Sequence, residues 1–281
     1  AASSSCRLRQ RSPSPSSSSS PSSHLTKVVD AALQTLKDSG FINYFGLQRF
    51  GTGAIPTHVI GRSLLKKDFS KAIELILSSR LGSHTPPFPL QQKDIDALFP
   101  RIAKWMNPEF DILNVLRKGN GGVNSVANAL DAIPRSMRML YVHAYQSFVW
   151  NNMVTLRLQK GGLNVMVGDL VLDELKTDNA TDVSVATGDE DFEMKDELAI
   201  TEEETKGKRG LPNVLIVTEE DIANNKYTAF DIVLPLPGAA SVYPTNMLRE
   251  YNTMLQEEGT YDVFQNATSS STATTYSVYH L

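Results

Sequence analysis

The sequence contains a single cysteine, Cys6, among its 281 residues. One thiol cannot form a disulfide within the chain, and it excludes a zinc site built from several cysteines. No apolar run approaches the roughly 20 residues that cross a bilayer, and the longest candidate, Phe230 to Leu236, has the length of a strand. We therefore expect a soluble protein of a reducing compartment, the nucleus or the cytoplasm, with no membrane partner.

Several common enzymatic signatures are also missing. The chain has no serine nucleophile elbow, no phosphate-binding loop of the Walker type and no His-Glu-x-x-His metal pair. Gly51-Thr52-Gly53 lacks the third glycine of a dinucleotide fingerprint, and the five histidines are widely separated. The sequence therefore predicts no cofactor and no metal.

Charge is unevenly distributed along the chain. The formal net charge is −4, but the segment 173–209 has 13 acidic and five basic residues, which leaves 22 basic and 18 acidic residues elsewhere. An RNA-binding body with an acidic surface loop and a neutral enzyme are both compatible with this pattern. Charge alone does not decide between them.

The first 24 residues are rich in Ser and Pro, and we expect residues 1–24 to form a disordered tail. Arg7, Arg9 and Arg11 occur before the first acid, Asp30, a pattern also found in organellar transit peptides. A solvated tail is the preferred interpretation, and mitochondrial targeting stays open.

Periodicity predicts a mixed α/β (α+β) fold. Apolar residues from Leu25 to Leu36 recur at three- and four-residue steps, which indicates an amphipathic helix that Gly40 can end. Further helices are expected at 58–67, 70–79, 93–105, 109–118, 123–132 and, after Pro134, 135–160. In the last of these, one face is expected to hold Leu140, Ala144, Phe148, Asn151, Val154 and Leu158. Strand-like segments are 163–175, 213–217 and 230–238, and residues 256–281 are expected to be an irregular tail.

A short aromatic segment, "GFINYFGLQRFGTG" (residues 40–53), is the most unusual feature of the chain. Gly46 permits a tight or positive-φ turn that could present the Phe45 ring at the edge of a pocket, where Asn43 offers a donor and an acceptor. A ring and an amide suit an extracted nucleobase, and Arg49 could pair with a phosphate. The alternative, favoured by composition alone, is a buried aromatic turn that packs a helix on a sheet, with Arg49 in a structural ion pair.

The segment closely resembles the signature of the TruD family of pseudouridine synthases, Asn-Tyr-Phe/Tyr-Gly-x-Gln-Arg-Phe-Gly. Two later segments, Met137 to Leu158 ("MRMLYVHAYQSFVWNNMVTLRL") and "VGDLVL" followed by Val217 to Gly238, resemble the family's eukaryotic branch in the same order. The resemblance implies a partial pseudouridine synthase core at 25–68 and a TruD-type insertion domain at 69–255. It further implies isomerisation of uridine to pseudouridine in RNA without a cofactor.

The resemblance also implies site residues. Asn43 would position a catalytic aspartate and Phe45 would stack on the target base, while Tyr44, Gln48, Arg49 and Phe50 would bind the substrate. The expected partner is RNA, with tRNA as the first choice and mRNA and snRNA as alternatives. No obligate protein partner is inferred.

The family's aspartate belongs to a Lys-Asp-x-x-Ala-x-Thr-x-Gln segment before the aromatic signature, and no such segment precedes Gly40. Asp68 follows a lysine but lies downstream without the rest of the pattern, so we do not assign it as catalytic. We expect a fragment of a synthase, inactive alone. The alternatives are a non-catalytic RNA-binding remnant, a truncated gene product and an unrelated helical scaffold.

Overall fold

A computed structural model of the chain describes residues 21–82, 85–86, 88–102, 108–119, 123–173, 214–238, 241–265 and 278–280. It divides into two compact units, Ala1–Asn43 and Tyr44–Leu281. The first unit contains helix α1 (Pro21–Ser39), which begins four residues before the expected start. Gly40 ends the helix as predicted, with φ of 68° and its N–H donating to the Leu36 carbonyl at 2.9 Å.

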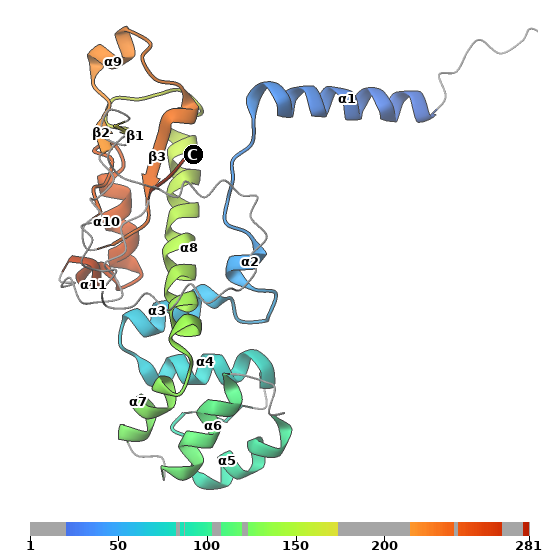
Figure 1. Ribbon diagram of the computed structural model, residues 1–281, viewed down its shortest axis with the longest axis vertical. Helices are drawn as coiled ribbons and strands as arrows, with labels where there is room; N and C mark the ends of the chain where they lie inside the picture. The colour runs from blue at the N-terminus through green and yellow to red at the C-terminus, as the bar shows by residue number, and fades with distance from the viewer. Residues whose placement is uncertain are drawn as a thin grey trace, which may run out of the picture. The chain divides into compact units, whose positions relative to one another are not determined.

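The second unit combines helices with one small antiparallel sheet, which confirms the α+β class (Figure 1). Its α-helices are α2 (Leu47–Phe50), α3 (Thr57–Leu65), α4 (Phe69–Leu81), α5 (Gln92–Leu98), α6 (Glu109–Lys118), α7 (Val123–Asp131), α8 (Arg135–Gly161), α9 (Glu219–Ala223), α10 (Leu248–Glu257) and α11 (Tyr261–Gln265). The described residues also form the 3₁₀ helices η2 (Phe99–Arg101) and η5 (Ala229–Asp231). The strands are β1 (Leu170–Leu172), β2 (Val214–Ile216), β3 (Ile232–Pro235) and β4 (Val278–His280).

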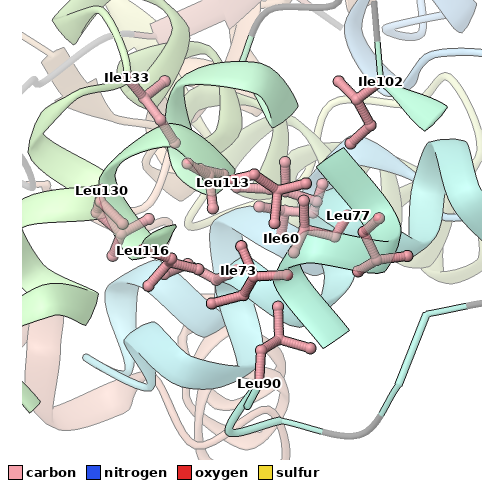
Figure 2. Packing of buried hydrophobic residues seen from close by; sticks show 14 of the residues in the cluster. Ile60, Ile73, Leu77, Leu90, Ile102, Leu113, Leu116, Leu130 and Ile133 are labelled. Carbon is pink, nitrogen blue, oxygen red and sulfur yellow. The ribbon is translucent and has the colours of Figure 1, made fainter. Parts of the chain in front are cut away.

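Helices α3 to α7 enclose the first of two hydrophobic cores. Figure 2 shows aliphatic side chains from these helices and from the segments that connect them pointing toward one another, with Ile73 of α4 and Leu113 of α6 fully buried. The spacing of Ala72, Ile73, Ile76 and Leu77 places all four on one side of α4, where each is at most 1% exposed. The helices around this core, α3 to α7, lie in the lower half of the view in Figure 1.

Helix α8 connects this core to the second one, in which α8 and α10 pack with α11. The predicted single face of α8 is wrong in part, because Leu140 is 37% exposed while Gln146, Trp150 and Arg157 are at most 1% exposed. The cause is that the helix is covered from several sides. The Trp150 Nε1–H donates to the Leu234 carbonyl of β3 at 3.0 Å, and the Gln146 amide donates to Pro237 at 2.8 Å.

The four strands lie in the order β2-β1-β3-β4 and every neighbouring pair is antiparallel. Leu172, the last residue of β1, is opposite Val214, the first residue of β2. The two ends of the segment that connects these strands are therefore close together. Next to β1, the Arg157 guanidinium binds both carboxylate oxygens of Asp169, at 2.8 and 2.6 Å. Both side chains are at most 1% exposed, and this pair joins the end of α8 to the start of the sheet.

The structure differs from the sequence expectations in several places. A tight or positive-φ turn was predicted at Gly46, but this residue has φ of −107° and is the N-cap of α2, which excludes the positive-φ form. The strand-like segments 163–175 and 230–238 contain strands of only three and four residues. Helix α5 gives way to η2 at Phe99 because Pro100 cannot donate the next helical hydrogen bond.

Other expectations concern the ends and the domains. The tail predicted to be irregular from 256 contains α11 and β4, a strand of three residues that is too short to show a period in the sequence. Residues 1–20 and the acidic segment from 174 to 209 lie outside the described residues. The proposed boundary between a core segment and an insertion domain at 68/69 stays a prediction.

Candidate functional site

One side chain of α8 binds the main chain of Phe45 in the aromatic segment. The Phe45 N–H donates to Oδ1 of Asn151 at 3.1 Å, and Nδ2 of Asn151 donates to the Phe45 carbonyl at 2.9 Å. A single amide thus satisfies both main-chain polar groups of Phe45, as a neighbouring strand would in a sheet. Because residues 41–46 have no regular secondary structure, this contact defines where Phe45 lies.

The Phe45 ring is partly buried between an aromatic ring and a cation. It packs edge-to-face on Trp150, with ring centroids 5.3 Å apart and an interplanar angle of 78°. The Arg49 guanidinium carbon lies 5.4 Å from the Phe45 centroid. These distances are typical of favourable aromatic and cation–π contacts. A planar group that stacks on this face of Phe45 would have to share it with Arg49 or displace it.

Other residues of the aromatic segment also make contacts outside it. The Tyr44 hydroxyl and the Thr155 hydroxyl lie within hydrogen-bond distance at 3.1 Å, one helical turn after Asn151. Phe50 at the end of α2 packs edge-to-face on His58 of α3, with centroids 5.5 Å apart. His58 in turn stacks on Phe148 of α8 at 4.2 Å. The aromatic segment therefore contacts α8 directly through Tyr44, and the Phe50 ring reaches α8 through His58.

Positive charge and burial keep the two histidines near this segment neutral. Burial lowers the pKa of His143, the hydrogen bond with Gln146 acts in the opposite direction, and the Arg49 charge lowers this pKa further. Burial also lowers the pKa of His58, with the Arg62 charge in the same direction and Glu258 opposing it. The site thus has a cationic guanidinium and neutral imidazoles at neutral pH.

The sequence-predicted site residues do not all fall in one place. Phe45 and Arg49 are in contact, Tyr44 reaches α8, and Gln48 is exposed on α2. Phe50 is partly buried, and its ring packs on His58. Asn43 belongs to the first unit, where its side chain is exposed.

Asp68, the aspartate that follows a lysine and is not assigned as catalytic, has a structural role. Asp68 is the N-cap of α4, and its side chain accepts a hydrogen bond from the Lys71 N–H at 3.1 Å. The residue is exposed. An aspartate at a helix N-cap is a common structural role, and the exclusion of Asp68 from the catalytic assignment stays a prediction.

Sequence reasoning missed the residues of α8 that hold the segment. The sequence places Asn151 and Phe148 on one helix face with core residues, and it assigns no role to Trp150 or Thr155. The signal that could have found them is the run Phe148-Val149-Trp150-Asn151-Asn152, in which two adjacent amides follow two large rings.

Two negative findings complete the description of the site. Within the described residues, no group of three or more His, Cys, Asp or Glu side chains is placed to hold a metal ion. No helix in the same part of the chain combines the length and the apolar character needed to cross a membrane.

Comparison with known proteins places these features in a family. A family model described as tRNA pseudouridine synthase D (TruD) matches residues 17–206. Pseudouridylate synthase 7 homolog from Homo sapiens is 34% identical over 234 residues, which cover 81% of this chain and 29% of that protein. Multisubstrate pseudouridine synthase 7 from Schizosaccharomyces pombe is 35% identical over 241 residues, which cover 84% of this chain and 34% of that protein. The chain thus spans about a third of the length of these relatives.

A solved structure from Methanosarcina mazei, described as a TruD protein, has the same fold. Its TM-score is 0.59 at 21% identity, and the match covers 93% of this chain and 56% of that one. The arrangement of helices and antiparallel strands described above is therefore shared over nearly the whole chain.

Proposed function

Because the chain belongs to the TruD family of pseudouridine synthases, we propose that it contributes the base-holding part of an RNA pseudouridine synthase. The reaction would be the isomerisation of uridine to pseudouridine, with tRNA as the first substrate to test and mRNA and snRNA as alternatives. The observation that carries this proposal is the fixed, partly buried Phe45 ring with the Arg49 guanidinium beside it.

Phe45 and Arg49 have different tasks in this proposal. The ring stacks on the target base, and Arg49 leaves the ring face to bind an adjacent phosphate. Tyr44, Gln48 and Phe50 bind the surrounding nucleotide, and Asn43 positions the catalytic aspartate. No cofactor is required, because the essential carboxylate acts directly on the sugar–base unit.

Binding of a tRNA transcript, followed by fluorescence anisotropy over a salt series, tests the proposal. Phe45→Ala should weaken binding by about 1–3 kcal/mol, the usual contribution of one stacked base. Arg49→Ala should weaken binding and reduce the salt slope by about one. Phe230→Ala and Arg249→Ala are matched controls at exposed positions, and both should bind like the parent chain. No affinity at low salt would exclude the proposal.

The chain alone is proposed to bind RNA without turnover, because its sequence contains no match to the aspartate segment that the family resemblance implies. Tritium release from RNA labelled at uridine C5 measures this directly. Robust release by the 281-residue chain would show that the catalytic assignment is wrong.

We place this activity in the nucleus or the cytoplasm, which agrees with the single cysteine of the chain. Imaging of a tagged chain in cells checks this, and a mitochondrial signal would favour the transit-peptide alternative.

A further inference from the structure

We infer that Asn151 is a positioning residue that acts on the RNA base through Phe45. The inference rests on the proposed function, since it assumes that Phe45 stacks on a base. Asn151 itself does not have to touch RNA. Its task is to fix the main chain of Phe45 so that the ring is presented in one orientation.

The two hydrogen bonds of Asn151 support this role. They join Oδ1 to the Phe45 N–H at 3.1 Å and Nδ2 to the Phe45 carbonyl at 2.9 Å. Two bonds to one residue restrict its rotation as well as its position, which one bond would not do. Of the uncharged side chains of this length, only an amide offers a donor and an acceptor side by side.

The helix that carries Asn151 is a rigid support. Trp150, the preceding residue, is 1% exposed and is tied to β3 through its bond to Leu234. Thr155, one turn later, donates to the Asn151 carbonyl at 3.0 Å and lies 3.1 Å from the Tyr44 hydroxyl. Phe45 therefore takes its place from the buried framework of α8 and β3, and not from the irregular segment that contains it.

Asn152 provides a matched control on the same helix. Its side-chain amide donates to the Phe148 carbonyl at 2.7 Å, a local bond within α8. Asn151→Leu and Asn152→Leu make the same chemical change at adjacent positions. Only the first removes the hydrogen bonds to Phe45.

The experiment combines two measurements on the full chain. Hydrogen exchange of the Phe45 amide, followed by NMR without RNA, reports the hydrogen bond itself. Asn151→Leu should accelerate this exchange by about five- to tenfold, as expected for one lost hydrogen bond. Asn152→Leu should leave it unchanged. Asn151→Ala, which removes both hydrogen bonds with a smaller side chain, is the second variant if Asn151→Leu does not fold, and it should accelerate the exchange to the same extent.

The second measurement is a double-mutant cycle on tRNA affinity. Asn151→Leu should weaken binding by at least about fivefold, toward the loss for Phe45→Ala. In the Phe45→Ala background it should add less than about twofold, since its effect passes through the ring. A full additional loss in that background would overturn the inference, and so would unchanged affinity. If the parent chain binds no tRNA, the proposed function fails, and the exchange result shows separately whether Asn151 holds Phe45.

Discussion

His58 is a titratable group inside an aromatic cluster. Its ring stacks on Phe148 at 4.2 Å, contacts Phe50 edge-to-face, and has a buried Nδ1 without a hydrogen-bond partner. Burial and the Arg62 charge lower its pKa from the usual value of 6.5. The folded state therefore binds fewer protons than the unfolded state just below pH 6.5.

We expect His58 to make stability depend on pH in the acidic range. The contribution of the neutral ring is complete above pH 6.5 and is lost as pH falls through the lowered pKa. His58→Phe should reduce the loss of unfolding free energy between pH 7 and pH 5, measured by urea denaturation. It should not abolish that loss, because His143 also has a lowered pKa. An unchanged pH profile would contradict the assignment.

Glu109 has the opposite behaviour. The residue is 3% exposed, one oxygen lies 3.4 Å from Nε of Arg80, and the other, Oε2, is buried without a partner. Burial raises its pKa, with its backbone hydrogen bond and Arg80 opposing. The folded state favours the protonated acid, so stability falls as pH rises from 4.5 through the raised pKa.

Glu109→Gln should therefore stabilise the protein at pH 7, by about 1 kcal/mol, within the usual cost of a buried unpaired group. The gain should disappear at pH 4, where the native carboxyl is protonated. Denaturation at both pH values checks this. Glu74→Gln, at a more accessible carboxylate paired with Lys71, is the control and should show no such gain. A gain of equal size at both pH values would contradict the explanation.

At the scale of the elements, the approach of α3 to α8 depends on one glycine. A Cβ on Gly61 would lie 1.9 Å from the Tyr141 carbonyl oxygen, which belongs to the backbone of α8 and cannot move independently. Ile60 and Leu65 of the same helix belong to the first and the second core, so this close approach lies in a helix that takes part in both.

Gly61→Ala should lower the free energy of unfolding by about 1–3 kcal/mol, the usual cost of overpacking. The effect should appear despite the better helix propensity of alanine. Gly53→Ala is the control, since its nearest neighbour is the Ile55 carbonyl at 3.9 Å, and it should change stability by less than about 0.5 kcal/mol. If Gly61→Ala and Gly53→Ala had equal effects in thermal or urea denaturation, α3 and α8 would be able to move apart without a loss of unfolding free energy.

The helices of this fold were predictable from sequence to a greater extent than the site. Helix α6 has the predicted bounds, and α3, α4, α7 and α8 differ from theirs by a few residues, because apolar periodicity and the stops at Gly and Pro are local signals. The contact between Asn151 and Phe45 joins positions 106 residues apart, and no local pattern encodes such a pair. The burial of the charged Arg157 side chain was not predicted, because its partner, Asp169, lies beyond the end of α8 and outside the helical pattern.

At the scale of the whole molecule, charge is separated along the chain. The segment 174–213 contains 12 acidic and five basic residues, so removing it changes the formal net charge from −4 to +3. The strands that flank it are direct neighbours, with Leu172 opposite Val214. A short turn can therefore connect them, and an Asn-Gly turn suits two antiparallel strands.

We expect a chain with 174–213 replaced by a short Asn-Gly turn to fold and to bind tRNA more tightly. Loss of like-charge repulsion should raise affinity several-fold at low salt, with a smaller gain at high salt because screening removes long-range effects. Circular dichroism and thermal unfolding verify the fold, and anisotropy over a salt series measures binding. A same-length segment with its acids changed to Asn and Gln is the matched control, because it removes charge but retains the chain. If that control gains affinity and the short turn loses it, the segment itself contacts RNA, and the electrostatic explanation is insufficient.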